Sequence, residues 1–409
     1  MIEMNVKQKM VGINGDEAAA YALKQCNVDL LSAYPITPQT IIVEKFSEYV
    51  ANGEVETEFV TVESEHSAMS VCIGGAAAGG RVCTATASAG LALMHEMVFI
   101  AASHRLPIVM TVASRALSGP INIHPDHSDS MAERDSSWIQ LYAENPQEVY
   151  DTVIQAFKIA EDPTVQLPCM VMFDGFIVSH TLQNVSVLPD NVVAKFVGQR
   201  RIPKINVMGR ETEYKLDVEN PITMGPLALF DYYFEHKRQQ EEAIKNAKQI
   251  ICDVNDEFAQ VSGRKYGNGL LQQYGFEDAE LSIICLGSTA GTIRTVIEEY
   301  RTKGIKVGVI RLKTFRPFPE NELKTALRNV KAVAVLDRSG GYGAIGGPVF
   351  NELRSILYDC KERPFIVNYI YGLGGRDVTP KLIKKVYEDL RNIVKTGQVK
   401  ENVKFLGVR

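Results

Sequence analysis

The sequence has no cysteine pair at the spacing that metal centres use. Its seven cysteines lie far apart along the chain, and no two of them form a CxxC pattern. A structural zinc or an iron–sulfur cluster needs several thiolates that converge on one centre, usually from closely spaced pairs. We therefore expect reduced, mostly buried cysteines with a packing role, at positions 26, 72, 83, 169, 252, 285 and 360.

The sequence also lacks long apolar runs and runs of one charge. The most apolar region, residues 70–112, is interrupted by charged and histidine side chains, so no stretch of about 20 apolar residues is present to span a bilayer. Residues 1–10 do not have the pattern of a secretory signal. Lys and Arg number 44 against 49 Asp and Glu, without a basic cluster, which argues against nucleic acid or a membrane as the main partner. We expect a cytoplasmic protein.

The first half of the chain alternates short apolar strands with helical patterns. This alternation predicts an α/β fold with a parallel sheet covered by helices on both faces. Ligands of such sheets bind at the carboxyl ends of the strands. The expected strands are 30–34, 58–62, 81–87 and 107–112, and the expected helices are 14–25, 40–52, 65–78 and 90–102.

The pattern changes in the middle of the chain. Residues 187–224 have no clear period, and residues 234–257 form a charged, helix-like stretch. Strand and helix patterns resume at residue 281 and continue through the strands 306–311 and 331–336. We predict two domains, residues 1–252 with the connecting segment and a smaller α/β domain of residues 253–409.

The loop Tyr34-Pro35-Ile36-Thr37-Pro38 follows the first of these strands. Its two prolines restrict the backbone, so the hydroxyl of Thr37 would be held in a defined direction. A rigid strand-to-helix turn with Thr40 as cap explains the same pattern. The loop is a candidate site segment on spacing alone.

A second loop carries Glu63 and Glu65 at the start of a helix rich in Ala and Gly. A glutamate in a first helical turn is favoured by the helix dipole, so one of the two carboxylates could serve as a cap only. The small residues at 74–80 predict that another helix or a cofactor ring packs closely against this helix.

A third loop begins with Arg115 after the strand 107–112. A guanidinium at a strand end suits a substrate carboxylate, although a surface arginine is the commoner case. Beyond it the polar residues Asn122, Asp126, His127 and Asp129 follow closely. We expect an active-site loop here and no metal site, since the spacing does not show convergence.

Several motifs occur in the order found in one enzyme family. They are YPITP at 34–38, ESEHSA at 63–68, TATASAGLALMHE at 84–96, SRALSGPINIH at 114–124, DHSD at 126–129, FRPFP at 315–319 and GLGGRDVTP at 372–380. The first five resemble the pyrimidine-binding domain of the 2-oxoacid:ferredoxin oxidoreductases. The last two resemble that family's second domain, which is similar to the carboxy-terminal domain of transketolase.

The resemblance implies an alpha subunit that shares thiamine diphosphate with a beta subunit. The glutamate matching Glu65 hydrogen-bonds the aminopyrimidine ring and promotes the imino form that removes the C2 proton, and Glu63 is the alternative register. Pro35 and Ile36 are expected at the cofactor. The residues matching Thr37 and Arg115 hold the substrate carboxylate.

The resemblance also implies partner chains. Family beta subunits bind the diphosphate and Mg²⁺ through a Gly-Asp-Gly motif, for which the nearest string here is Phe173-Asp174-Gly175. Gamma- and delta-type subunits, [4Fe-4S] clusters outside this chain, coenzyme A and ferredoxin complete the expected enzyme. Pyruvate is the expected substrate, with 2-oxoisovalerate, 2-oxoglutarate and oxalate as alternatives.

Three other classes of function stay open at this point. One is a non-oxidative thiamine enzyme and another is a purely structural subunit. The third is a dinucleotide-binding dehydrogenase, suggested by the GxGxxG string at 341–346. That string lacks the acidic residue expected about 20 positions later at a strand end, so a tight strand-to-helix connection is the better interpretation.

Overall fold

The first sheet carries the loops that were singled out from the sequence. In this computed structural model, which describes residues 6–409, seven strands lie in the order β14-β6-β7-β5-β4-β2-β3. All neighbours pair in parallel except β14 (Thr314–Arg316), which comes from the C-terminal part of the chain and pairs antiparallel with β6. The others are β2 Leu30–Ala33, β3 Glu58–Thr61, β4 Val82–Thr86, β5 Ile108–Ser114, β6 Ile139–Tyr142 and β7 Cys169–Asp174. The predicted parallel sheet is confirmed.

Helices cover both faces of this sheet. Successive strand residues point to opposite faces: Cys83 and Val109 belong to one apolar cluster, while Val82 and Ile108 belong to another. The first cluster includes α1 (Gly15–Gln25), α2 (Thr40–Ala51) and α7 (Pro146–Ala160), and the second includes α3 (Glu65–Ala77), α4 (Ser88–Leu93) and α5 (His95–Ser103). Burial on both faces explains why the central strands β5 and β7 are largely apolar.

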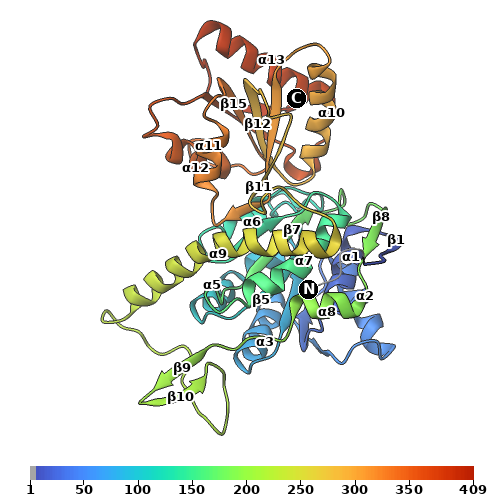
Figure 1. Cartoon of the computed structure of the whole chain (residues 1–409), viewed down its shortest axis with the longest axis vertical. Coiled ribbons are helices and arrows are strands. Elements are labelled where there is room, and N and C mark those ends of the chain that lie inside the picture. Colours follow the sequence, from blue (N-terminus) through green and yellow to red (C-terminus); the bar gives the residue numbers. More distant parts are fainter. Residues whose placement is uncertain (1–5) are drawn as a thin grey trace.

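Residues 187–224, which have no clear sequence period, contain a short helix and a β-hairpin. Strand β8 (Gln183–Val187) pairs antiparallel with β1 (Lys9–Ile13), and α8 (Asp190–Val197) follows. Strands β9 (Lys204–Val207) and β10 (Arg210–Glu213) then form a hairpin, and α9 spans Tyr233–Ser262. Figure 1 shows the hairpin projecting at the end of the molecule opposite the second sheet. We call residues 199–232, which connect α8 to α9, the arm.

The second sheet has six strands in the order β11-β13-β12-β15-β16-β17, parallel except for β11. Helices α10 and α13 cover one face, and α11 and α12 the other. The strands are β11 Leu271–Tyr274, β12 Leu281–Leu286, β13 Val307–Leu312, β15 Ala332–Asp337, β16 Phe365–Tyr371 and β17 Val403–Leu406. The helices are α10 Thr289–Arg301, α11 Glu320–Ala326, α12 Pro348–Leu357, the short 3₁₀ turn η1 Leu373–Gly375 and α13 Pro380–Thr396.

The two sheets share one apolar cluster, and the chain of the second domain supplies the edge strand β14 of the first sheet. Met170 of β7 and Ile310 of β13 belong to the same buried cluster, and β14 leaves the second sheet to join the first. Residue 253, where the sequence pattern divides the domains, lies within α9, so the chain passes this point without leaving the helix. The second sheet starts only at β11.

The structure also bears on the cysteines and on membrane-spanning helices. All seven cysteines are free thiols, five of them buried and Cys252 and Cys360 partly exposed. Within residues 6–409, no helix is both long enough and apolar enough to cross a lipid bilayer.

Candidate active site

The candidate residues lie where β2, β3 and β5 end. Because these strands are parallel, the loops that follow them meet at one edge of the sheet. The loop 34–39 follows β2, Glu65 begins α3 after β3, and Arg115 directly follows β5. The structure therefore brings together the three loops that were chosen from the sequence.

Glu65 is the first residue of α3 and is buried, with 6% of its surface exposed. Ser64 is the N-cap, and its side chain accepts a hydrogen bond from the backbone N–H of Ser67. The cap is thus supplied by Ser64, and the Glu65 carboxylate accepts no hydrogen bond from any of the described residues. A carboxylate on a buried residue that has no partner among the described residues can accept a hydrogen bond from a ligand.

Gly90 in α4 lies directly against this carboxylate. A Cβ atom at residue 90 would lie 2.6 Å from Oε1 of Glu65 and 2.6 Å from Oγ1 of Thr86, so only glycine fits without displacing the acid. Sequence reasoning missed Gly90, and the small residues of the TATASAG segment were the signal that could have found it.

Glu63 has a different environment, although it is only two residues away. Its side chain is exposed and accepts a hydrogen bond from the Ser67 hydroxyl, which lowers the pKa of the Glu63 carboxyl. Of the two carboxylates, Glu65 is the one beside α4.

Arg115 is buried and connects two of the site loops. Its Nε donates to the carbonyl of Asn122 at 2.8 Å, and its Nη1 donates to the carbonyl of Thr37 at 2.9 Å. Nη2 makes no hydrogen bond within the described part of the chain. The guanidinium is therefore held in place by backbone groups while one of its nitrogens stays free. The Thr37 side chain is exposed at the same place, beside Pro35 and the half-buried Ile36.

Asp129 binds the backbone of three segments. Its Oδ2 accepts from the backbone N–H of Ser88 at 3.0 Å and of Arg115 at 2.9 Å, and its Oδ1 accepts from Ser130. Burial raises the pKa of Asp129 to about 6, against the lowering effect of these three N–H groups. Asp129 was expected in a substrate loop; the structure uses its carboxylate to fix the starts of α4 and of the Arg115 loop.

Asp126 and His127 contact the second domain. Asp126 accepts from the backbone N–H of Gly374 at 3.2 Å. The buried His127 ring lies 2.8 Å from Asp174 Oδ1, and its backbone N–H donates to Arg338. The side chain of Asn122 likewise donates to the Gly374 carbonyl. These side chains, predicted to form a polar active-site loop, are engaged in contacts within the chain.

The small residues of α3 are explained by packing between elements. A Cβ atom at Gly75 would lie 3.1 Å from Leu30 of β2 and 3.3 Å from Val82 of β4. Gly79 faces Ile202 and Lys215 of the arm. Gly75 and Gly79 are thus approached by the sheet and the arm, and not by the helix or the cofactor ring that the sequence predicted.

In the Phe173-Asp174-Gly175 string, the Asp174 carboxylate contacts other side chains of the same chain. Asp174 accepts from the backbone N–H and the hydroxyl of Ser288 and forms ion pairs with His127 and Arg338. Burial opposes ionisation, but Arg338 and His127 hold the pKa of Asp174 well below its usual range. Its oxygens are occupied by side chains of the same molecule.

The GxGxxG string at 341–346 connects β15 to α12, as the sequence favoured. Asp337 accepts the backbone N–H groups of Val349 and Phe350 at the start of α12. These are the groups that would bind a dinucleotide phosphate. The chain's own carboxylate takes that place, so the helix offers no phosphate site there.

Comparison with known proteins identifies the family. Residues 21–256 match the model of "Pyruvate flavodoxin/ferredoxin oxidoreductase, thiamine diP-bdg", and residues 279–383 match "Pyruvate:ferredoxin oxidoreductase core domain II". The pyruvate synthase subunit PorA of Thermotoga maritima is 51% identical over 98% of both chains, and that of Methanocaldococcus jannaschii is 50% identical over 91% of this chain and 93% of its own. The chain belongs to the 2-oxoacid:ferredoxin oxidoreductases. It is an alpha subunit of that family.

Another relative supports the family, and two solved structures share the fold. The ketoisovalerate oxidoreductase subunit VorA of Pyrococcus abyssi is 43% identical over 99% of both chains. The 2-oxoglutarate:ferredoxin oxidoreductase of Magnetococcus marinus has a similar fold, with a TM-score of 0.69 at 19% identity over 93% of this chain, which spans 65% of that longer chain. A split-gene transketolase aligns with a TM-score of 0.52 at 14% identity, over 94% of this chain and 98% of its own. The predicted fold, a thiamine diphosphate-binding domain followed by a transketolase-like domain, is confirmed.

Proposed function

We propose that this chain supplies the pyrimidine half of the thiamine diphosphate site of a pyruvate:ferredoxin oxidoreductase. The complex would convert pyruvate and coenzyme A to acetyl-CoA and CO₂ and pass two electrons to ferredoxin, or run the reverse synthesis. The observation that carries this proposal is the Glu65 carboxylate, which is buried at the head of α3, lies against Gly90 and accepts no hydrogen bond from the described residues.

Glu65 would hold the proton of a pyrimidine ring nitrogen. Thiamine diphosphate, when bound, supplies a nucleophilic carbon for the 2-oxo group and an electron sink for decarboxylation. The carboxylate fits this ring because it lacks another partner among the described residues and is held from one side by an α-helix with no side chain at residue 90. Its part in the chemistry is to bind the ring N–H and so favour removal of a proton elsewhere on the ring. Pro35 and Ile36 would pack at the same ring.

Arg115 and Thr37 would hold the substrate carboxylate. The free Nη2 of Arg115 and the exposed hydroxyl of Thr37 lie on the two loops that the Arg115–Thr37 hydrogen bond joins. A guanidinium fixed by two backbone carbonyls binds a carboxylate with little loss of conformational entropy. Asp129 supports this arrangement through the backbone of Arg115.

The rest of the reaction is assigned to partner chains. Asp174 is occupied by His127, Ser288 and Arg338, so we assign the diphosphate and Mg²⁺ to a beta subunit. The cysteines are scattered, and the described residues contain no group of three or more His, Cys, Asp or Glu that could hold a metal ion. We therefore assign the [4Fe-4S] clusters and the transfer of electrons to ferredoxin to gamma- and delta-type subunits. A cytoplasmic location is part of the same proposal.

We favour pyruvate among the 2-oxoacids because the relatives with 50–51% sequence identity to this chain are pyruvate synthase subunits. Both the Thermotoga and the Methanocaldococcus proteins are named pyruvate synthase subunits, whereas the VorA proteins are 42–43% identical. Pyrococcus PorA proteins are no more similar than VorA, at 41–43%, so a direct substrate comparison is needed.

The test is reduction of a viologen dye by the complex copurified anaerobically on tagged alpha chain. Coenzyme A-dependent reduction is measured with pyruvate, 2-oxoisovalerate, 2-oxoglutarate and oxalate at equal concentrations. We expect kcat/KM for pyruvate to exceed that for each other acid by at least about tenfold, which corresponds to roughly 1.4 kcal/mol of transition-state binding. A preference for another acid would overturn the substrate, and no reduction by a cluster-loaded complex would overturn the activity.

A further inference from the structure

Large apolar side chains are exposed along the arm and at the start of α9. Val218 is 93% exposed, Leu227 86%, Phe230 90% and Phe234 77%. Leu229, Tyr232 and Tyr233 lie among them and are also exposed. An exposed run of aromatic and aliphatic residues of this length marks a protein–protein contact, because its solvation is unfavourable in a free chain.

The arm is anchored to the first domain at defined points. The backbone N–H of Leu216 donates to the carbonyl of Ala77 at 2.8 Å, and Nη2 of Arg200 donates to the carbonyl of Ala76 at 2.9 Å, both at the end of α3. Gly225 has a φ of +69°, and a Cβ atom there would lie 2.2 Å from Nε2 of His104. The arm therefore presents its apolar residues from a fixed position beside α3 and α5.

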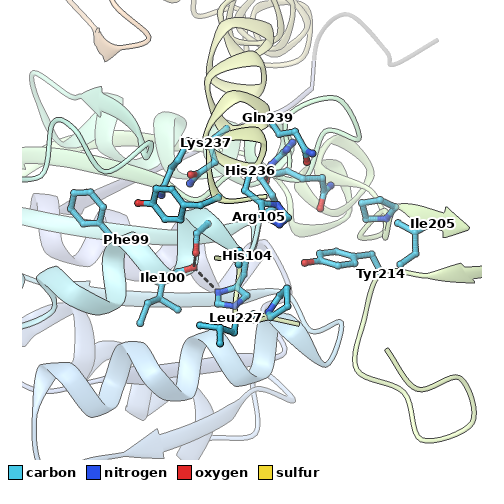
Figure 2. A pocket seen from close by; sticks show the side chains of 18 of the residues that line it. Phe99, Ile100, His104, Arg105, Ile205, Tyr214, Leu227, His236, Lys237 and Gln239 are labelled. Carbon is cyan, nitrogen blue, oxygen red and sulfur yellow. Dashed lines mark hydrogen bonds between the residues drawn. The ribbon is translucent and has the colours of Figure 1, made fainter. Parts of the chain in front are cut away.

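A pocket of about 690 Å³ opens between the arm and α5 (Figure 2). Phe99 and Ile100 of α5 line one side, and the exposed Leu227 and Tyr233 line the other. Figure 2 shows His104 and Leu227 next to each other beneath the start of α9. The pocket lies away from Glu65 and Arg115, so it is a part of the arm surface and not the substrate site.

An exposed strip on α4 and α5 connects this pocket to Glu65. Gly90 lies against Glu65 at one end, and His104 lies against Gly225 of the arm at the other. Between them Leu93 at the end of α4 and Glu96 and Ser103 of α5 are exposed, and Ile100 of α5 is partly exposed.

We infer that the arm and this strip form the docking surface for the subunit that holds the diphosphate end of the cofactor. This inference rests on the proposed function. A single cofactor shared between two chains requires that subunit to cover the face at Glu65, and the strip continues the same face to the pocket and the arm. The loops around the site also expose apolar side chains, at Tyr34, Leu93, Ile121, Ile123 and Ile177. A single partner subunit would cover both the apolar side chains of the arm and those of the loops around the site.

The first experiment places a photo-crosslinker in the intact complex. Phe230 is replaced by p-benzoylphenylalanine, which keeps an aromatic side chain there, and crosslinked chains are identified by mass spectrometry. We expect the crosslink on the chain that carries the Gly-Asp-Gly motif. Tyr358, exposed after α12 in the second domain, receives the same group as the matched control and should give at least tenfold less of that product. A crosslink to a second alpha chain, or equal yields at the two positions, would overturn the inference.

The second experiment uses Leu229→Asp with Phe230→Asp. Copurification of the Gly-Asp-Gly chain on tagged alpha should fall at least tenfold, while Tyr358→Asp should leave it unchanged; undiminished recovery would overturn the inference. Dye reduction by the wild-type complex separates this result from the proposed function. If the Phe230 crosslink forms but the wild type reduces no dye, the docking surface stands and the activity fails. If the wild type reduces dye but Phe230 crosslinks to another alpha chain, the activity stands and the docking surface fails.

Discussion

The edge of the first sheet and the junction between the two sheets both contain buried carboxylates, but these carboxylates have opposite surroundings. At the junction, Glu148 of α7 accepts two hydrogen bonds from Arg311 at 2.7 and 2.9 Å and one from Lys313 at 3.0 Å. Burial alone would raise the pKa of Glu148, but the two cations hold it at about 2. At the sheet edge, Glu65 has no such partner among the described residues.

Other carboxylates at the junction are also paired with cations, although burial raises the pKa of Asp151 above its ordinary value. Asp151 of α7 accepts from Arg264 and Tyr266, which follow α9, and Asp174 pairs with Arg338. Removing one member of a buried pair leaves an uncompensated charge, whereas a buried carboxylate without a partner can bind a ligand. The comparison separates groups that hold the two domains together from a group that is directed outward, to a cofactor and a second subunit.

Substitution of Glu65 should have the largest effect and should act on turnover alone. We expect Glu65→Gln to lower kcat about 100- to 10,000-fold, the range for loss of a positioned acid or base, because the amide cannot take up the ring proton. Assembly and the thermal midpoint should be unchanged, since no contact within the described chain is removed. Glu63→Gln is the matched control and should keep wild-type kcat. Normal turnover of the Glu65 variant would refute its role.

Substitution of Glu148 should have the reverse effect, on stability and not on chemistry. Glu148→Gln leaves Arg311 and Lys313 buried without a counter-charge, so we expect the free energy of unfolding to fall by about 3–5 kcal/mol. Thermal unfolding of the purified complex measures this change. Glu48→Gln removes an exposed pair with Lys45 and should cost under about 1 kcal/mol. Equal losses for the two variants would contradict the distinction between buried and exposed pairs.

The pH dependence of the Glu148 contribution has a defined sign. The folded pKa of about 2 lies below the ordinary value of 4.5, so the stabilisation is fully present above pH 4.5 and is lost as the pH falls from there through about 2. The stability difference between wild type and Glu148→Gln should therefore shrink over that interval. A constant difference would mean that the ion pair is not its cause.

The same comparison explains which features were accessible from the sequence. Apolar strands such as 82–86 and 281–286 are buried on both faces, and burial leaves a pattern that a single sequence reveals. Strands β9 and β10 have four residues each and are mostly exposed, so the alternation in Lys204–Val207 is too short to have indicated the hairpin. The expected helix 90–102 is two helices, α4 and α5, that meet at Met94.

At the site, the sequence predicted residue types at strand ends but not their contacts. The loops of Thr37, Glu65 and Arg115 were chosen because polar groups interrupt apolar segments there, whereas the preference for Glu65 over Glu63 came from the family resemblance. The Glu148–Arg311 pair joins residues 163 positions apart, and the contacts of Asp129 are made to backbone N–H groups. Neither kind of contact has a periodic signal, since each depends on how the loops and domains meet.

Asp129 is neither unpaired like Glu65 nor paired with a cation like Glu148. Of the substitutions at these three residues, that of Asp129 should have the smallest effect. Its two oxygens serve the backbone N–H groups of Ser88, Arg115 and Ser130. In Asp129→Asn one of these oxygens becomes an NH₂ group, which cannot accept, so at least one buried N–H loses its partner. We expect KM for the 2-oxoacid to rise about tenfold through displacement of Arg115, from a cost of roughly 1–3 kcal/mol, while kcat falls less.

The pH profile distinguishes this positioning role from a general loss of stability. Because burial raises the pKa of Asp129 to about 6, protonation below that pH removes acceptor capacity in the wild type, and its KM should rise as the pH falls from 7 to 5. The asparagine has no such proton, so the KM of the variant should be nearly constant over the same interval. The exposed Asp135 provides the control, since Asp135→Asn should follow the wild-type profile. If Asp129→Asn and wild type have parallel profiles, the carboxylate does not act through Arg115, and Asp129 would belong with the junction carboxylates instead.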